Sequence, residues 1–294
     1  GSDTSSDDVV DFSAKTTAMN VDLSIGQATG DGVDTLTGIE HIIGGSGNDT
    51  LEGDNLVNSI FGGTGDDTLI GNGGDDTLSG GTGGTNSFIG GSGDDTFNGS
   101  GVKDIADYSA LGSGIKVDLS LGTAQVSNDG EGGSDTLNSV PHIFGTSAVD
   151  TIIGDTEANS LVGNGDADTL YGGSGNDILD GGNNDDILRG DAGNDSIIGG
   201  SGNDTIDFSA VGLAIDVDLG NNVVADDGQG GNDTLDSIEN VIASAQADTV
   251  VGDANANVIN AGAEDDVITG AAGNDTIFGE AGEDTLSGGS DLDT

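Results

Sequence analysis

The sequence predicts an all-β fold in which short repeats stack on one another, a β-solenoid. A nine-residue unit recurs along the chain, and its clearest copies read GGSGNDTLE, GGTGDDTLI, GGSGNDILD and GGSGNDTID, starting at Gly44, Gly62, Gly172 and Gly199. A unit this short cannot fold alone and must stack on its neighbours. The apolar positions recur every nine residues rather than at helical spacing, and frequent glycine opposes a helix.

Within each unit, glycine occupies positions one, two and four, aspartate position six and a large aliphatic residue position eight. Glycine at three positions suits a turn that needs positive φ and close backbone packing. Position eight repeats an apolar side chain and therefore predicts the core. The expected core residues include Leu51, Ile60, Leu69, Leu78, Phe97, Leu170, Leu179, Leu188, Ile197, Ile206, Ile259, Ile268, Ile277 and Leu286.

The units form three arrays. The first runs over residues 44–107 with one extra residue near Asn86, the second over 145–207, and the third starts at Ala243. A trace of a preceding array has Asp8 at position six and Val10 at position eight. This pattern predicts the end of an earlier array at 1–11, and then three rolls, each preceded by a spacer, at 12–107, 108–207 and 208–294.

The spacers share a second motif, present three times. Each begins with Asp-Phe/Tyr-Ser-Ala, at Asp11, Asp107 and Asp207. A Val-Asp-Leu segment follows, and in the second spacer Ile115, Val117, Leu119 and Leu121 alternate with polar residues, which is the period of a β-strand. A glycine-rich turn then ends in Asp-Thr-Leu, at Asp34, Asp135 and Asp233. The last part of the spacer reads Ile-Glu-His-Ile from Ile39, Val-Pro-His-Ile from Val140 and Ile-Glu-Asn-Val from Ile238.

The composition limits the partners of the chain. Its 294 residues include 57 glycines and no cysteine, and its formal net charge is −50. Such charge with few aromatic residues favours disorder, whereas the periodic aliphatic residues favour a fold provided that cations neutralise the charge. Nucleic acid and anionic membrane surfaces would be repelled, and no apolar run is long enough to span a bilayer.

The repeated aspartate predicts metal binding. Turn carbonyl oxygens and a carboxylate, without histidine or cysteine, form a hard-ligand set that favours calcium over zinc or copper. Magnesium is less suitable because it retains water and requires octahedral geometry. We therefore expect several calcium ions and a chain that is largely disordered until it binds them.

The nonapeptide resembles the RTX, or haemolysin-type, calcium-binding repeat. This resemblance implies a parallel β-roll in which two units make one 18-residue coil, position eight fills the space between two sheets, and each ion lies between units n and n+2. It also implies that the position-six carboxylates are the metal ligands. These are Asp49, Asp67, Asp76, Asp95, Asp104, Asp150, Asp168, Asp177, Asp186, Asp195, Asp204, Asp248, Asp266, Asp275, Asp284 and Asp293.

Some units depart from this pattern. The second unit of every array has asparagine at position six, and Thr85 replaces aspartate in the first array. We expect the best sites late in each array, where glycine and aspartate coincide. The first choices are the pairs Asp177 with Asp195 and Asp186 with Asp204. The asparagines are Asn58, Asn159 and Asn257.

The sequence supports a catalytic role for these residues less well than it supports metal binding. The carboxylates recur by period instead of converging on one cleft, which argues against a glycosidase pair. His41 and His142 share a position that is Asn240 in the third spacer, which argues against a zinc or catalytic role. Ser13, Ser109 and Ser209 have no base at a fixed offset. The sequence therefore predicts no catalytic residue and no organic cofactor.

The resemblance implies a secreted protein, exported by type I secretion, that folds outside the cell where calcium is millimolar. We expect a non-enzymatic stalk, surface-layer, filament or adhesin module at the cell surface, with self-assembly as a possible property. The alternative is an accessory or secretion region of a secreted protease, lipase or polysaccharide-modifying enzyme. A calcium-dependent carbohydrate or ice binder is a third option, for which the sequence has no aromatic cleft or flat threonine array.

Overall fold

The computed structural model describes residues 8–101, 103–122 and 125–294. The chain divides into two compact units, 1–145 and 146–294. This division falls at the start of the second array, so the organisation into three rolls stays a prediction. Almost all the regular structure of the described residues is β-strand, with one short 3-10 helix at Leu219–Asn221. None of the described residues form a helix that is long and apolar enough to cross a bilayer.

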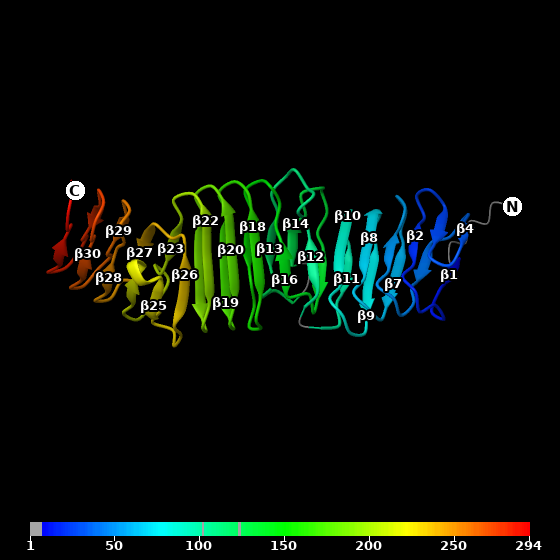
Figure 1. The fold of residues 1–294 in the computed structure, drawn as a ribbon, viewed down its shortest axis with the longest axis horizontal. Helices are drawn as coiled ribbons and strands as arrows, with labels where there is room; N and C mark the ends of the chain where they lie inside the picture. The colour runs from blue at the N-terminus through cyan, green and yellow to red at the C-terminus, as the bar shows by residue number, and fades with distance from the viewer. Residues whose placement is uncertain (1–7, 102, 123–124) are drawn as a thin grey trace. The chain divides into compact units, whose positions relative to one another are not determined.

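Two sets of parallel strands build the first unit (Figure 1). One six-stranded sheet has the order β1, β5, β7, β9, β11, β15, at Val9–Asp11, His41–Ile43, Ser59–Gly63, Thr77–Gly81, Thr96–Asn98 and Thr136–Asn138. The other runs β2, β6, β8, β10, β12, β16, at Asn20–Asp22, Thr50–Glu52, Thr68–Gly73, Ser87–Ser92, Ile105–Asp107 and His142–Phe144.

The second unit repeats this arrangement. One ladder runs β17, β19, β21, β23, β27, β29, β31, at Thr151–Ile153, Thr169–Ser174, Ile187–Ala192, Thr205–Asp207, Asn240–Ile242, Val258–Asn260 and Thr276–Phe278. The facing ladder has β18, β20, β22 and β26, at Ser160–Asn164, Ile178–Asn183, Ser196–Ser201 and Asp233–Asp236. It resumes with β28, β30 and β32, at Thr249–Val251, Val267–Thr269 and Thr285–Ser287.

The spacers continue the parallel ladders instead of interrupting them. In the second unit, Leu235 of the spacer pairs with Ile197, and Val241 pairs with Ile206. The Val-Asp-Leu segment lies in β2, β13 (Lys116–Asp118) or β24 (Asp216–Asp218), and each of these strands pairs antiparallel with an inserted strand. β2 and β24 also pair parallel with β6 and β28 of the ladder. The inserted strands are β3 (Gln27–Thr29), β4 (Val33–Thr35), β14 (Val126–Asn128) and β25 (Val223–Asp226). Each spacer thus adds strands in nonapeptide register and a short antiparallel meander or hairpin.

Position-eight side chains fill the space between the two ladders. Leu51 pairs with Leu69, and Leu170 pairs with Leu188 one 18-residue coil away. All four are fully buried. Two predicted core residues are exceptions: Ile277 is only half-buried, and Leu286 is 46% exposed, with no described strand on the far side of β32.

The extra residue of the first array lies before position six. The sequence places Thr85 at that position, but the structure places Asn86 there, because Asp67 N–H donates to Asn86 Oδ1 (3.1 Å). Gly83 and Gly84, with φ of 79° and 81°, absorb the insertion. The assignment of Thr85 is therefore wrong.

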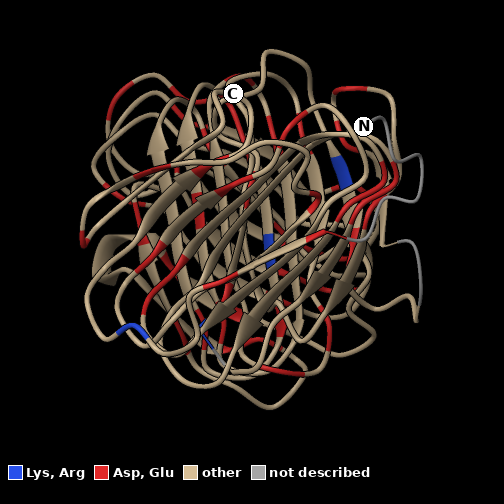
Figure 2. Cartoon of the chain, turned by 90° about the vertical axis from the view of Figure 1, so that its right-hand side faces the viewer, with Lys and Arg blue, Asp and Glu red and all other residues tan. Residues whose placement is uncertain are grey.

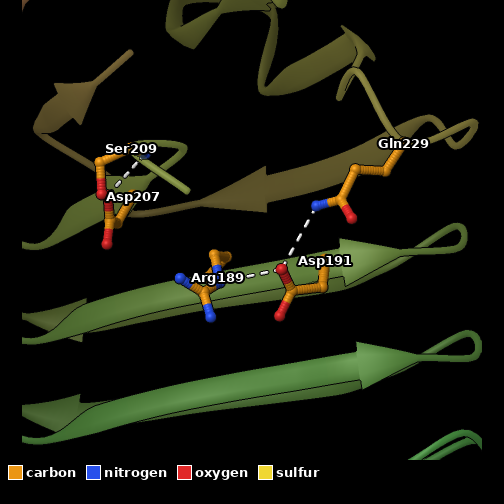
Figure 3. A network of polar contacts seen from close by, with 5 residues as sticks. All are labelled: Arg189, Asp191, Asp207, Ser209 and Gln229. Carbon is orange, nitrogen blue, oxygen red and sulfur yellow. Dashed lines mark hydrogen bonds and ion pairs between the residues drawn. The ribbon is translucent and has the colours of Figure 1, made fainter. Parts of the chain in front are cut away.

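The first residues of each spacer fix the chain as it leaves the array. Asp11, Asp107 and Asp207 each accept a hydrogen bond from the backbone N–H of the serine two residues on, as Figure 3 shows for Asp207 and Ser209. This turn uses the local hydrogen bonding that aspartate favours. The intervening aromatic residues Phe12, Tyr108 and Phe208 are buried.

Candidate metal centre

The position-six side chains form a ladder that links successive coils. Within each array, the Oδ1 atom of one residue accepts a hydrogen bond from the backbone N–H of the position-six residue one coil earlier. The N–H of Asn159 donates to Asp177 Oδ1 (2.8 Å), and the N–H of Asp177 donates in turn to Asp195 Oδ1 (2.8 Å). On the other ladder, Asp186 N–H donates to Asp204 Oδ1 (2.9 Å). The predicted pairs therefore do come together, n with n+2.

The second carboxylate oxygen, Oδ2, is the distinctive atom of most of these turns. Among the described residues it is buried and has no hydrogen-bond partner at the position-six aspartates of what we call the open turns. A buried carboxylate oxygen without a partner is costly unless a cation lies beside it. The open turns are those of Asp67, Asp76, Asp95, Asp168, Asp177, Asp186, Asp195, Asp204, Asp266 and Asp275.

Glycine at position one leaves room for this oxygen. A Cβ atom on Gly172 would lie 2.5 Å from Asp177 Oδ2 and 2.6 Å from the carbonyl oxygen of Gly190, one coil further on. The same two kinds of oxygen surround Gly62 and Gly270. Among the described residues no position-one glycine has positive φ, so of the two expected demands on the turn this position meets close packing. It needs space.

The φ angle of the residue at position two sets the direction of its backbone N–H. In every open turn the residue at position two has positive φ, as in Gly173 (95°) and Gly182 (104°), and even Asp191 (64°) and Ala271 (81°) adopt it. The N–H of such a residue does not donate to the position-six side chain of its own turn. Glycine adopts this conformation at no steric cost, which explains its frequency at position two.

Other turns are closed by their own hydrogen bond. In these closed turns position two lacks positive φ, and its N–H donates to the position-six side chain four residues on. Gly45 N–H donates to Asp49 Oδ2 (2.7 Å), and Ser244 N–H donates to Asp248 Oδ2 (2.8 Å). Ser100 and Thr146 donate in the same way to Asp104 and Asp150. Four predicted ligands therefore have an internal hydrogen-bond donor on the oxygen that is free in the open turns.

The asparagine units are closed turns as well. Asn257 Oδ1 accepts from Asp253 N–H (2.9 Å), and its Nδ2 donates to the Glu239 carbonyl oxygen (2.8 Å). Asn58 makes the equivalent bonds with Asp54 N–H (2.7 Å) and the Glu40 carbonyl (3.2 Å). The amide supplies both a donor and an acceptor, which a carboxylate cannot do. Asparagine at the second unit thus satisfies the turn without a metal.

The last two predicted ligands are less enclosed. Asp284 and Asp293 are half-buried, and their Oδ1 atoms accept from Asp266 and Asp275 N–H, both at 3.2 Å. A Cβ atom on Gly279 would lie 2.6 Å from Asp284 Oδ2, so the same space is present.

Burial raises the pKa of most of the open-turn carboxyl groups. Desolvation is the largest cause, and it raises the pKa of Asp67 to about 6, of Asp76 and Asp195 to about 7 and of Asp168 to about 8. The hydrogen bond from the preceding coil lowers each pKa, and neighbouring carboxylates raise it. A bound cation would reverse these shifts because it favours the charged form.

The donor set fits a hard divalent cation. Most open turns, such as those of Asp67, Asp177 and Asp275, bring one partnerless carboxylate oxygen close to a backbone carbonyl oxygen, and these are ligands that calcium prefers. Within the described residues, no three His, Cys, Asp or Glu side chains converge on one point. Backbone carbonyl oxygens or water must therefore complete the coordination of any ion held by these turns.

Several residues of the spacers join the position-six ladder, and we did not expect them there. Asp135 Oδ1 accepts from Asp95 N–H (3.0 Å), and Asp233 Oδ1 from Asp195 N–H (3.0 Å). Glu239 Oε2 accepts from Asp204 N–H (2.8 Å). The Asp-Thr-Leu tripeptide of the spacers matches positions six to eight of the nonapeptide. This match could have predicted the positions of Asp135 and Asp233 from the sequence.

The spacer serines and histidines lie in turns and at the starts of strands. The N–H of Ser209 donates to Asp207 Oδ1 (2.9 Å) within the local turn of Figure 3. His41 and His142 are half-buried at the first positions of β5 and β16. Figure 2 shows that acidic residues recur along the described chain and that basic residues are few.

The comparison with protein families agrees with this geometry. The model of the RTX calcium-binding nonapeptide repeat (4 copies) matches residues 34–55, 53–84, 80–101, 144–179, 180–210, 236–268 and 261–294. These matches cover roughly two thirds of the chain and fall in all three arrays. No curated protein sequence matches the chain. The parallel β-roll and the expectation of several calcium ions are confirmed, and the chain belongs to the RTX calcium-binding nonapeptide repeat family.

Proposed function

We propose that this chain is an extracellular structural segment that folds when calcium binds its open turns. One observation carries the proposal: buried, partnerless carboxylate oxygens recur in register at position six. They recur along both ladders of each unit and do not gather in a single cleft. Such a distribution suits a scaffold that calcium stabilises along its length.

The energetics favour coupling between calcium and folding. The chain carries a formal charge of −50, and the open turns bury carboxylates without a partner. Burying an unpaired charge costs several kcal/mol per group, whereas divalent cations repay that cost. Extracellular calcium is high enough to fill weak sites, so the chain would stay unfolded during export and fold outside.

Calcium removal tests this proposal. Circular dichroism and sedimentation velocity of the full chain would be followed while calcium is added to chelator-treated protein. We expect a disordered spectrum and an expanded chain without calcium, and a β spectrum with a compact species above a threshold concentration. An unchanged β spectrum in excess chelator would contradict the proposal.

Two neighbouring residues test the site assignment. Asp186 is an open-turn ligand, and Asp185 beside it is exposed and accepts a hydrogen bond from Asn203 N–H (2.9 Å). Asparagine preserves the Oδ1 acceptor at either position. We expect Asp186→Asn to lose at least one bound calcium ion and Asp185→Asn to lose none, measured by equilibrium dialysis with elemental analysis. Equal calcium contents for the two variants would contradict the assignment.

We place the segment in a stalk, surface-layer, filament or adhesin module. The support is the continuity of the ladders through the spacers of each unit, which favours an extended load-bearing role over an appendage to a catalytic domain. Electron microscopy of the calcium-loaded chain tests this role. Ordered fibres or sheets would support self-assembly, and separate particles at every concentration would argue against it.

A further inference from the structure

The third spacer contributes a turn that stacks on the second array. Asn232 N–H donates to Asn194 Oδ1 (3.1 Å), and Asp195 N–H donates to Asp233 Oδ1 (3.0 Å). These are the same two links that join successive nonapeptides. Gln229 Nε2 adds a hydrogen bond to Asp191 Oδ1 (3.2 Å), which also pairs with Arg189 Nε at 2.9 Å (Figure 3).

Asp227 lies at the start of this turn and belongs to no nonapeptide. Its side chain is 1% exposed. Its Oδ1 atom accepts hydrogen bonds from the N–H groups of Gln229, Gly230 and Gly231, at 2.7, 2.7 and 3.1 Å. Its Oδ2 atom is buried and has no hydrogen-bond partner among the described residues. Oδ1 thus stabilises the turn, and Oδ2 is available to bind a cation.

Further oxygen atoms surround that position. A Cβ atom on Gly231 would lie 3.0 Å from Asp227 Oδ2 and would overlap the carbonyl oxygen of Gly193. Both oxygens therefore lie against the same glycine. Asp195 is 2% exposed, and its Oδ2 atom is also partnerless in the described part of the chain. Asp195 N–H donates to Asp233 Oδ1 in the turn that Asp227 Oδ1 organises, so the two aspartates belong to the same junction. In keeping with this geometry, the carboxylate of Asp227 raises the pKa of Asp195.

We propose that Asp227 and Asp195, with the carbonyl oxygen of Gly193, bind a calcium ion at the junction between the second array and the third spacer. This inference rests on the proposed function, because it takes the Asp195 carboxylate as a calcium ligand. Two carboxylates and a carbonyl are hard oxygen ligands, and calcium completes its shell with further carbonyls or water. The ion ties the spacer turn to the array.

The equivalent junction in the first unit differs in its hydrogen bonds. Asp129 accepts from Gly133 N–H at both carboxylate oxygens (2.9 Å each). Tyr108 Oη donates to Asp135 Oδ2 (2.9 Å). The residue at the position of Tyr108 in the third spacer is Phe208, which has no hydroxyl group. The Asp129 carboxylate is satisfied by the backbone, so we assign the additional ion to the second unit.

Bound calcium per full-length chain tests the assignment, by equilibrium dialysis and elemental analysis at saturating calcium. Asp227→Asn keeps an oxygen acceptor for the turn, and we expect it to lose one ion relative to the unmodified chain. The matched control is Asp226→Asn, because Asp226 is exposed and its Oδ1 accepts from Gly228 N–H (3.0 Å). We expect the control to lose none.

The outcomes separate this inference from the proposed function. An Asp227→Asn variant that folds and binds as many ions as the unmodified chain overturns the junction site alone. An unmodified chain that binds no calcium overturns the proposed function. If Asp227→Asn does not fold, crystals of the calcium-loaded unmodified chain provide the test, because anomalous diffraction locates the calcium ions. A calcium peak between Asp195 and Asp227 supports the site, and the absence of a peak there overturns it.

Discussion

Glycine at position one leaves room for oxygen atoms, and glycine at position two permits a left-handed backbone. These separate requirements place the Oδ2 atom of Asp177 beside the carbonyl oxygen of Gly190, while Gly173 holds φ at 95°. Glycine thus provides space at position one and positive φ at position two. Substitutions at the two positions should separate these requirements.

Gly172→Ala tests the demand for space. The added methyl group would lie 2.5 Å from Asp177 Oδ2 and would displace the atoms around the candidate site. We expect a loss of bound calcium and a free energy of unfolding about 2 kcal/mol lower, as for an overpacked site. Gly165→Ala is the control, because its nearest atoms would be 3.6 Å away and its φ is not positive. Thermal melts and calcium content of both variants provide the measurement, and an equal effect would contradict the explanation.

Ala271→Gly tests the demand for a left-handed backbone. Ala271 holds φ at 81°, which costs a residue with a Cβ atom about 1 kcal/mol. We expect glycine to raise the melting temperature in saturating calcium. Ala272→Gly, at a neighbouring position without positive φ, should lower the stability by roughly 0.5–1 kcal/mol through backbone entropy. A decrease for both variants would refute the role of strain at Ala271.

At the scale of the element, open and closed turns satisfy the position-six side chain in different ways. The first two units of each array are closed turns, which satisfy position six with an N–H from position two. Thr146 and Ser244 occupy position two in such turns, where positive φ would be unfavourable for a residue with a Cβ atom. These turns form their hydrogen bonds without metal, so their position-six residues need no ion in the folded roll.

Asn257→Asp tests the closed turn. The new carboxylate would face the Glu239 carbonyl and the Asp253 carboxylate, to which Asn257 Nδ2 now donates at 2.8 and 3.1 Å. We expect a loss of about 2 kcal/mol, typical of a buried acceptor left without its donor, and no additional tightly bound calcium. The measurements are thermal melts and calcium content. A stabilised variant with one more ion would show that this turn can be opened.

At the scale of the whole molecule, the raised pKa values make the calcium-free fold depend on pH. The folded pKa of Asp76 and Asp195 is about 7, above the ordinary value of 3.8, so the folded chain binds more protons than the unfolded chain between these values. The stability from these groups is therefore present at low pH and is lost as pH rises through about 7.

We expect the chelator-treated chain to gain β structure as the pH is lowered from 8 to 5. The same protonation competes with calcium, so the calcium concentration needed for half-folding should rise over this range. Circular dichroism at several pH values, with and without calcium, measures both effects. A calcium-free chain that is more ordered at pH 8 than at pH 5 would contradict the sign.

The sequence by itself determined the repeat, the core and the calcium chemistry. The nine-residue period placed Leu51 and Leu170 in the core and aspartate at the turns, because stacking of short units requires one apolar and one polar position per unit. The family comparison agrees with that interpretation.

Only the tertiary structure decided which carboxylates lack a partner. Asp49 and Asp67 look alike in sequence, but Gly45 N–H reaches the Oδ2 atom of Asp49, whereas Gly63 has a φ of 113° and Asp67 Oδ2 has no partner in the described chain. The spacer residue Asp227 likewise reaches the array only through the stacking of its turn on Asp195. Both outcomes depend on contacts between coils, and residues that are many positions apart make those contacts.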